Sequence, residues 1–142
     1  MKIFNKIGLV DQGVERRDFK VTSPLWAQDE DSSIVVLPSS DFKISYTLDY
    51  RHPVLGSRYM DIKIDTENFV KELAGARTFC LQEEAKALVK SGLGKGANYE
   101  NTLVVASNGV VKNKLRFEDE FIRHKILDLL GDFYLLGMPI KG

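Results

Sequence analysis

The sequence predicts an α+β domain, in which a mainly antiparallel sheet carries helices on one face as a two-layer sandwich. Residues 42–48 alternate apolar and polar side chains, as a strand with one buried face does. Residues 103–111 hold Asn108-Gly109 between apolar runs, a strong signal for a tight hairpin. Residues 117–132 repeat apolar side chains at helical spacing. Strands come first and helices are interspersed later, which favours the α+β class.

Composition limits the kind of protein this is. The chain has 142 residues, enough for one domain with a real core. Twenty Lys and Arg balance twenty Asp and Glu, so net charge favours neither nucleic acid nor a membrane surface as a partner. The single Cys80 fits a reducing compartment. No apolar run reaches the about 20 residues of a transmembrane segment, so we expect a soluble cytoplasmic protein.

In the first half of the chain, each element follows from a local pattern. Phe4 and Ile7 stand three apart before Gly8, which predicts the end of a helix over residues 1–8. Alternating or apolar runs separated by turn residues then predict a series of strands. These strands are residues 17–28, 34–37, 42–48 and 59–64, with a hairpin loop at 29–32.

Two short helices are predicted between these strands and the helix at 117–132. The first begins near Thr66, a plausible N-cap, and has Phe69, Val70 and Leu73 as its apolar stripe. The second covers residues 82–91 and is closed by Gly92. Its inward-facing side chains are expected to be Ala85, Leu88 and Val89.

The helix at 117–132 carries the most informative polar side chains. His124 and Asp128 stand one turn apart on one face, where imidazole and carboxylate can chelate one divalent metal such as zinc. Asp132 follows one turn later on the same stripe. A catalytic zinc site typically has three protein ligands, and the only other histidine, His52, precedes a proline in a loop. An isolated pair of this kind can also be a hydrogen bond on the helix surface.

Several segments together resemble one family, the UDP-3-O-acyl-N-acetylglucosamine deacetylases, zinc enzymes of lipid A biosynthesis in Gram-negative bacteria. The resemblance rests on the FEDEF, RHKILD and GD letters of residues 117–132, ARTF at 76–79, YTLD at 46–49 and HPVLG at 52–56. It implies a two-domain enzyme with its active site between the domains. Residues 1–10 would be the tail of a linker helix, and residues 11–142 the second domain without its C-terminal end. Residues 81–105, approximately, would be an insert that forms an acyl-chain passage.

The resemblance also implies catalytic roles. His124 and Asp128 correspond to two of three zinc ligands. Thr78 resembles a threonine whose hydroxyl helps to hold the tetrahedral intermediate, although without the resemblance it could equally cap a helix. Asp132 matches an aspartate that orients a catalytic histidine.

Substrate-binding roles follow in the same way. Phe79 matches an aromatic residue at the substrate pocket, and Lys125 matches a lysine near the phosphates of the UDP-3-O-acyl-N-acetylglucosamine substrate. The favoured wall residues of the acyl passage are Leu81, Ala85 and Leu88, which would otherwise be ordinary core positions of a short helix.

The resemblance assigns part of the machinery to other segments. The third zinc ligand and the general-base glutamate would lie in the first domain, and the catalytic histidine beyond residue 142. We therefore expect this chain alone to be nearly inactive. Two alternatives stay open: a non-catalytic module that binds an acylated nucleotide sugar, and a homodimer whose copies pool their ligands.

Overall fold

The computed structural model describes residues 2–142 and confirms the α+β class, with mainly antiparallel pairing. Met1, at the start of the predicted N-terminal helix, lies outside the described residues, as do the side chains of Lys2, Phe4 and Asn5. In chain order the elements are α1 (Lys2–Ile7), β1 (Phe19–Lys20), β2 (Leu25–Asp29), β3 (Ser32–Val36), β4 (Lys43–Asp49), β5 (Ser57–Lys63), α2 (Thr66–Asn68), η1 (Phe69–Leu73), β6 (Thr78–Leu81), α3 (Gln82–Lys90), β7 (Thr102–Ala106), β8 (Gly109–Val110), α4 (Glu120–Tyr134) and β9 (Ile140–Lys141).

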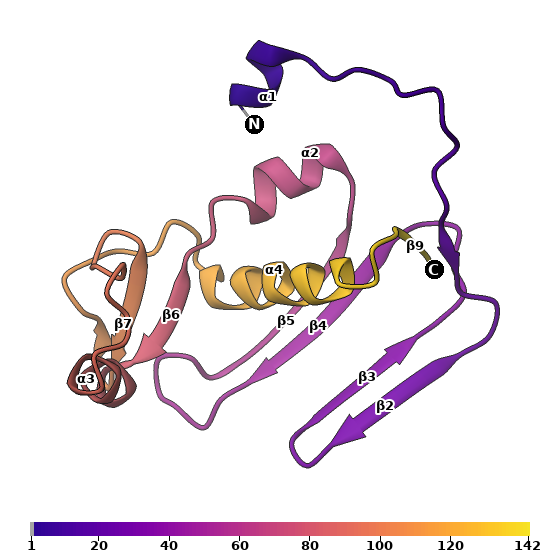
Figure 1. The fold of residues 1–142 in the computed structure, drawn as a ribbon. Helices are drawn as coiled ribbons and strands as arrows, with labels where there is room; N and C mark the ends of the chain where they lie inside the picture. Colours follow the sequence, from indigo (N-terminus) through magenta and orange to yellow (C-terminus); the bar gives the residue numbers. More distant parts are fainter. Residues whose placement is uncertain (1) are drawn as a thin grey trace.

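Helix α4 packs across one face of the β4–β5 hairpin (Figure 1). Ile44 pairs with Ile62 in the antiparallel register, and both are buried together with Leu48. The predicted alternation of residues 42–48 is therefore confirmed: the apolar positions face α4 and the polar ones face away.

Helix α4 connects the two hydrophobic clusters of the domain. Phe121 and Ile122 belong to the cluster with Leu48, Leu55, Leu103 and Val105. Ile126 and Leu130 belong to the cluster with Ile44, Ile62 and Leu73. The four buried apolar side chains of α4 each stabilise the fold by about 1.5–3 kcal/mol. The helix begins at Glu120, three residues later than the predicted start, because residues 117–119 form a turn closed by the Glu120 N–H on the carbonyl oxygen of Phe117.

Asp65, and not the predicted Thr66, caps the short helix α2. An oxygen of its carboxylate accepts a hydrogen bond from the Asn68 N–H at 2.8 Å. Either side chain has the chemistry of an N-cap, but Asp65 has the extended backbone that an N-cap needs, while Thr66 already lies inside the helix. Beyond α2, η1 buries Leu73 against the second cluster.

A small three-stranded sheet, β6–β7–β8, packs beside the first cluster. Strands β6 and β7 run parallel, and β7 and β8 form the predicted hairpin. Its turn lies one residue earlier than predicted: Ala106 pairs with Gly109, so Ser107 and Asn108 form the turn. Gly109 is then the first residue of β8 with φ of +146°, a backbone conformation that glycine adopts at little cost.

The predicted single strand over residues 17–28 is wrong. It is divided at Ser23 and Pro24 into β1, which pairs in parallel with β9, and β2, which forms an antiparallel hairpin with β3. Proline has no N–H to donate to a ladder, which favours a break at this point. The β2–β3 hairpin is confirmed, with Glu30 and Asp31 as its turn.

Candidate functional site

His124 and Asp128 lie one turn apart on α4, as predicted, and their side chains converge. Nε2 of His124 is 3.3 Å from Oδ1 of Asp128. The His124 side chain is mostly buried and the Asp128 side chain is partly exposed, so the pair lies where the protein surface meets the core. Because four α4 side chains are held in the two clusters, the core fixes the position of the backbone that carries both side chains.

The surroundings of His124 favour its neutral form. Burial lowers the pKa of the imidazole, the Asp128 carboxylate opposes this shift, and the Lys125 cation adds to it. The neutral imidazole is the form that binds a metal. Within the described residues, the buried Nδ1 of His124 has no hydrogen-bond partner.

Aromatic rings enclose His124 on the side of β6. The Phe79 ring meets the rings of Phe121, Tyr50 and His124 edge-on, with centroids 5.1, 6.0 and 6.3 Å away. Phe79 therefore lies beside the metal-ligand candidate His124. The sequence interpretation missed Tyr50 and Phe121 as part of this wall; Phe121 could have been found from its position one turn before His124 on the same helix face.

Lys125 places a cation next to the pair. Its Nζ lies 3.1 Å from Oδ2 of Asp128, so the two oxygens of that carboxylate face different partners. Burial on its own would lower the pKa of Lys125, but the hydrogen bond and charge of Asp128, with Tyr46 and Tyr50 nearby, raise it above its ordinary value. Lys125 is therefore a fixed positive charge at this site.

Thr78 and Asp132 lie at the edges of this arrangement. Thr78 is the exposed first residue of β6, directly before Phe79. Asp132 is exposed on α4, one turn beyond Asp128. The structure therefore brings Phe79, His124 and Asp128 together and adds Thr78 and Asp132 through their places on the same two elements.

The residues predicted to line an acyl passage lie on and before α3. Leu81 and Ala85 are half-buried, whereas Leu88 is 42% exposed and Val89 is 73% exposed. The expectation that Leu88 and Val89 face inward is therefore wrong. Of the described elements, only β6 and β7 pack appreciably against α3, and its far side faces solvent.

His124 and Asp128 provide two of the side-chain types that zinc prefers as ligands, and their spacing suits one ion. An imidazole nitrogen and a carboxylate oxygen at this separation can both reach one ion. Among the described residues, no group of three or more His, Cys, Asp and Glu is placed to hold a metal. His52 stays in its loop, as expected, where its Nδ1 accepts a hydrogen bond from the Val54 N–H at 3.3 Å.

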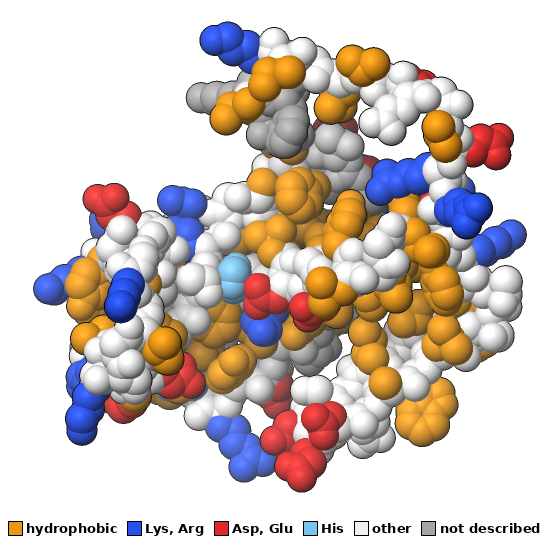
Figure 2. All heavy atoms as spheres, viewed as in Figure 1, with side chains coloured by type: hydrophobic (Ala, Val, Ile, Leu, Met, Phe, Trp, Pro, Cys, Tyr) orange, Lys and Arg blue, Asp and Glu red, His pale blue; other side chains and the backbone are white. Residues whose placement is uncertain are grey.

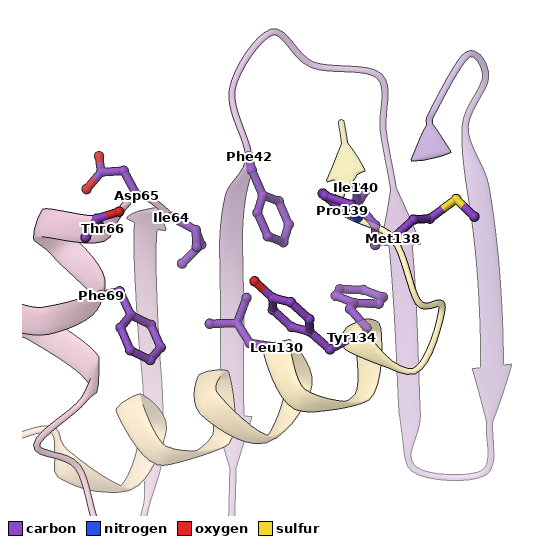
Figure 3. Close-up of a pocket in the computed structure, with 11 residues that line it drawn as sticks. Phe42, Ile64, Asp65, Thr66, Phe69, Leu130, Tyr134, Met138, Pro139 and Ile140 are labelled. Atoms are coloured by element: carbon purple, nitrogen blue, oxygen red, sulfur yellow. The ribbon is translucent and has the colours of Figure 1, made fainter. Parts of the chain in front are cut away.

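A separate apolar hollow of about 510 Å³ lies at the other end of α4 (Figure 3). Phe42, Phe69 and Tyr134 contribute rings to it, and Asp65 and Thr66 stand at its rim. None of the predicted site residues lines this hollow. Apolar side chains also gather on this face over η1 and the C-terminal half of α4 (Figure 2). The candidate site is therefore the His124 and Asp128 pair and its surroundings, and not this hollow.

Within the described residues, no helix has both the length and the apolar character needed to cross a membrane.

A family model described as UDP-3-O-acyl N-acetylglycosamine deacetylase matches residues 1–142. A protein named UDP-3-O-acyl-N-acetylglucosamine deacetylase from Thermodesulfovibrio yellowstonii is 41% identical over 141 residues, which are 99% of this chain and 48% of that protein. Proteins of the same name from Saccharophagus degradans and Acidithiobacillus ferrooxidans are 39% and 38% identical, over 99% and 95% of this chain and 47% and 45% of their own length. The chain spans about half the length of these relatives.

Proposed function

The chain belongs to the UDP-3-O-acyl N-acetylglycosamine deacetylase family, and on this premise we propose that its site serves the zinc-dependent hydrolysis of UDP-3-O-acyl-N-acetylglucosamine. The reaction would release acetate from the 2-acetamido group and leave a free amine, as the committed step of lipid A biosynthesis in a Gram-negative bacterium. The observation that carries the proposal is the 3.3 Å approach of Nε2 of His124 to Oδ1 of Asp128 beside Phe79. We place the reaction in the cytoplasm, where the single Cys80 would stay reduced.

We also propose a division of the chain. Residues 11–142 would correspond to the second of two domains, residues 1–10 to the end of a linker helix, and residues 81–105, approximately, to the acyl-passage insert. The coverage of about half of each relative supports this division. The third zinc ligand, the general base and the catalytic histidine would come from segments of the relatives outside the match.

His124 and Asp128 would hold the zinc, which when bound supplies a Lewis acid and lowers the pKa of water to about 7. The Thr78 hydroxyl would donate a hydrogen bond to the developing oxyanion. Lys125 would attract the diphosphate, because its charge is fixed at the site. Asp132 would accept a hydrogen bond from the catalytic imidazole and keep its orientation.

The exposed side of α3 suits a passage for an acyl chain. The Leu88 side chain is 42% exposed, so a bound alkyl chain could remove its exposed part from water. Half-buried Leu81 and Ala85 would continue this wall towards Phe79 on β6. The exposure of Leu88 therefore fits a residue of a binding wall better than a residue of the core.

A chimera would test this proposal. This chain would replace the segment that it matches in the Thermodesulfovibrio yellowstonii relative, and zinc content and acetate release from UDP-3-O-acyl-N-acetylglucosamine would be measured. The chimera should hold about one zinc and release acetate. His124→Ala should abolish both, whereas His52→Ala, which changes the other histidine, should affect neither.

Two outcomes would count against the proposal. A folded chimera whose zinc and activity survive His124→Ala would reject the metal site. A chimera that binds the nucleotide sugar but releases no acetate would favour the non-catalytic binding module. For the isolated 142-residue chain, zinc retained at one ion per two chains would favour ligand pooling in a homodimer.

A further inference from the structure

A buried ion pair connects the two elements that carry the site. Nε and the backbone N–H of Arg77 both donate to Oε1 of Glu120, at 2.8 and 3.0 Å, and Nη2 donates to Oε2 at 3.2 Å. The guanidinium also donates to the carbonyl oxygens of Lys114 at 2.7 Å and Glu100 at 3.3 Å. The Arg116 N–H donates to Oε2 of Glu120 at 2.6 Å. The Glu120 side chain is fully buried and that of Arg77 is 7% exposed.

Both partners of the ion pair lie close in the sequence to site residues. Arg77 directly precedes Thr78 and Phe79 on β6. Glu120 lies one helical turn before His124 and begins α4. A shift of either partner would therefore move the strand that carries Thr78 relative to the helix that carries His124.

Stability alone is a poor explanation for this pair. Well-packed apolar residues of similar volume often stabilise a fold as well as a buried ion pair does, because desolvation offsets much of the attraction. What a forked guanidinium adds is direction, because its N–H groups fit a carboxylate in one geometry only. The neighbouring aromatic contacts, such as Phe79 on Phe121, have weaker orientational preferences.

We propose that Arg77 and Glu120 are positioning residues, which hold Thr78 and Phe79 in register with His124 for the reaction. The inference rests on the proposed function, since it assigns the pair a purpose at that site. Neither side chain needs to touch the substrate or the metal. Arg123 offers a matched contrast: it is also mostly buried and also paired, but it joins α4 to Glu72 of η1 instead of to the segment that carries β6.

The first test uses the zinc-free 142-residue chain and the nuclear Overhauser effect between the ring protons of Phe79 and His124. Arg77→Lys keeps the charge but removes the fork, so this signal should fall by at least half in a folded variant. Arg123→Lys makes the same chemical change on the same helix and should leave the signal unchanged. A retained signal in Arg77→Lys, or an equal loss in both variants, would overturn the proposal. If Arg77→Lys does not fold, Glu120→Asp, which shortens the carboxylate arm by one carbon, is measured in its place.

The second test measures kinetics in the chimera, normalised to zinc content. A displacement of about 1 Å can cost up to roughly a hundredfold in rate, so kcat of Arg77→Lys should fall at least about tenfold. KM and zinc content should stay close to those of the parent, which a loss of folded protein would not produce. An unchanged kcat would overturn the proposal. An inactive parent chimera would refute the proposed function instead. The nuclear Overhauser effect between Phe79 and His124 would still decide whether the ion pair positions β6 relative to α4.

Discussion

Helices α4 and α3 both carry predicted site residues, yet the fold treats them differently. Helix α4 has five buried residues and extends across both hydrophobic clusters, whereas α3 has none. The metal-ligand candidates and Lys125 lie on the first helix, and Ala85 and Leu88 of the proposed acyl wall lie on the second. The proposed metal chemistry, which would depend on distances of a few tenths of an ångström, would thus be carried by the helix that the core holds. The proposed contact with a flexible alkyl chain would be carried by a helix without buried residues.

The largest expected effect concerns packing of the two helices. Ile126→Ala on α4 should lower the free energy of unfolding by about 2–5 kcal/mol, because the side chain is fully buried and leaves a cavity. Leu88→Ala on α3 should lower it by less than about 0.5 kcal/mol, as for other surface changes. Urea unfolding of both variants measures this difference. Similar losses for the two would contradict the contrast between the helices.

Acid should also affect the α4 end more than the α3 surface. Burial alone would raise the pKa of Glu120, but hydrogen bonds and charge from Arg77 and the Arg116 N–H lower it below its usual value of 4.5. The folded chain therefore binds fewer protons here than the unfolded one, so the contribution to stability is present above about pH 4.5 and is lost as pH falls through the lowered pKa. The difference in thermal midpoint between the parent and Glu120→Gln should shrink between pH 6 and pH 3.

The control for this experiment is Glu83→Gln, the same substitution on the exposed side of α3. Its thermal midpoint should follow that of the parent at every pH. A gap between the parent and Glu120→Gln that stays constant down to pH 3 would show that the charge of Glu120 is not what stabilises this region.

Substrate affinity should depend on α3 without a change in the metal site. In the chimera, Leu88→Glu should raise KM roughly tenfold, the equivalent of about 1.4 kcal/mol of lost apolar contact with the acyl chain. Zinc content and kcat should remain those of the parent. Lys86→Glu, on the same helix but without an apolar side chain to lose, should leave KM unchanged. An equal rise for both would indicate a charge effect instead of an acyl wall.

The smallest expected effect concerns Cys80, at the junction of β6 and α3. Burial raises the pKa of its thiol, and the nearby Glu84 carboxylate raises it further. At pH 8 the folded chain should therefore react several times more slowly with iodoacetamide than the urea-unfolded chain, as followed by mass spectrometry. An equal rate in the folded and unfolded chains would mean that this junction opens more readily than the packing indicates.

Much of the fold could be predicted because it depends on local patterns. The alternation at 42–48 required one buried strand face, and the spacing of His124 and Asp128 is a property of any helix. The errors arose where two local solutions were close in energy. Asp65 and Thr66 are both good N-caps, and a two-residue turn can use Asn108 with Gly109 or Ser107 with Asn108. Only the pairing of Ala106 with Gly109 and the backbone at Asp65 distinguish them.

Other features could not be read from the chain because they join distant residues. Arg77 and Glu120 are 43 positions apart, and the meeting of Tyr50, Phe79 and His124 brings together the residue after β4, strand β6 and helix α4. The exposure of Leu88 also depended on what surrounds α3, since helical periodicity gives a face but not the element that covers it.

By itself, the sequence determined the class of the fold, the hairpins, the helix that bears the metal-ligand candidates and the resemblance that identified the family. These depend on periodicity, turn chemistry and short motifs, which act over a few residues. The tertiary structure alone decided which side chains meet across elements, how burial shifts their pKa values and which buried ion pair sets strand β6 against α4. These depend on packing, and the free energy of packing depends on partners that the local chain does not specify.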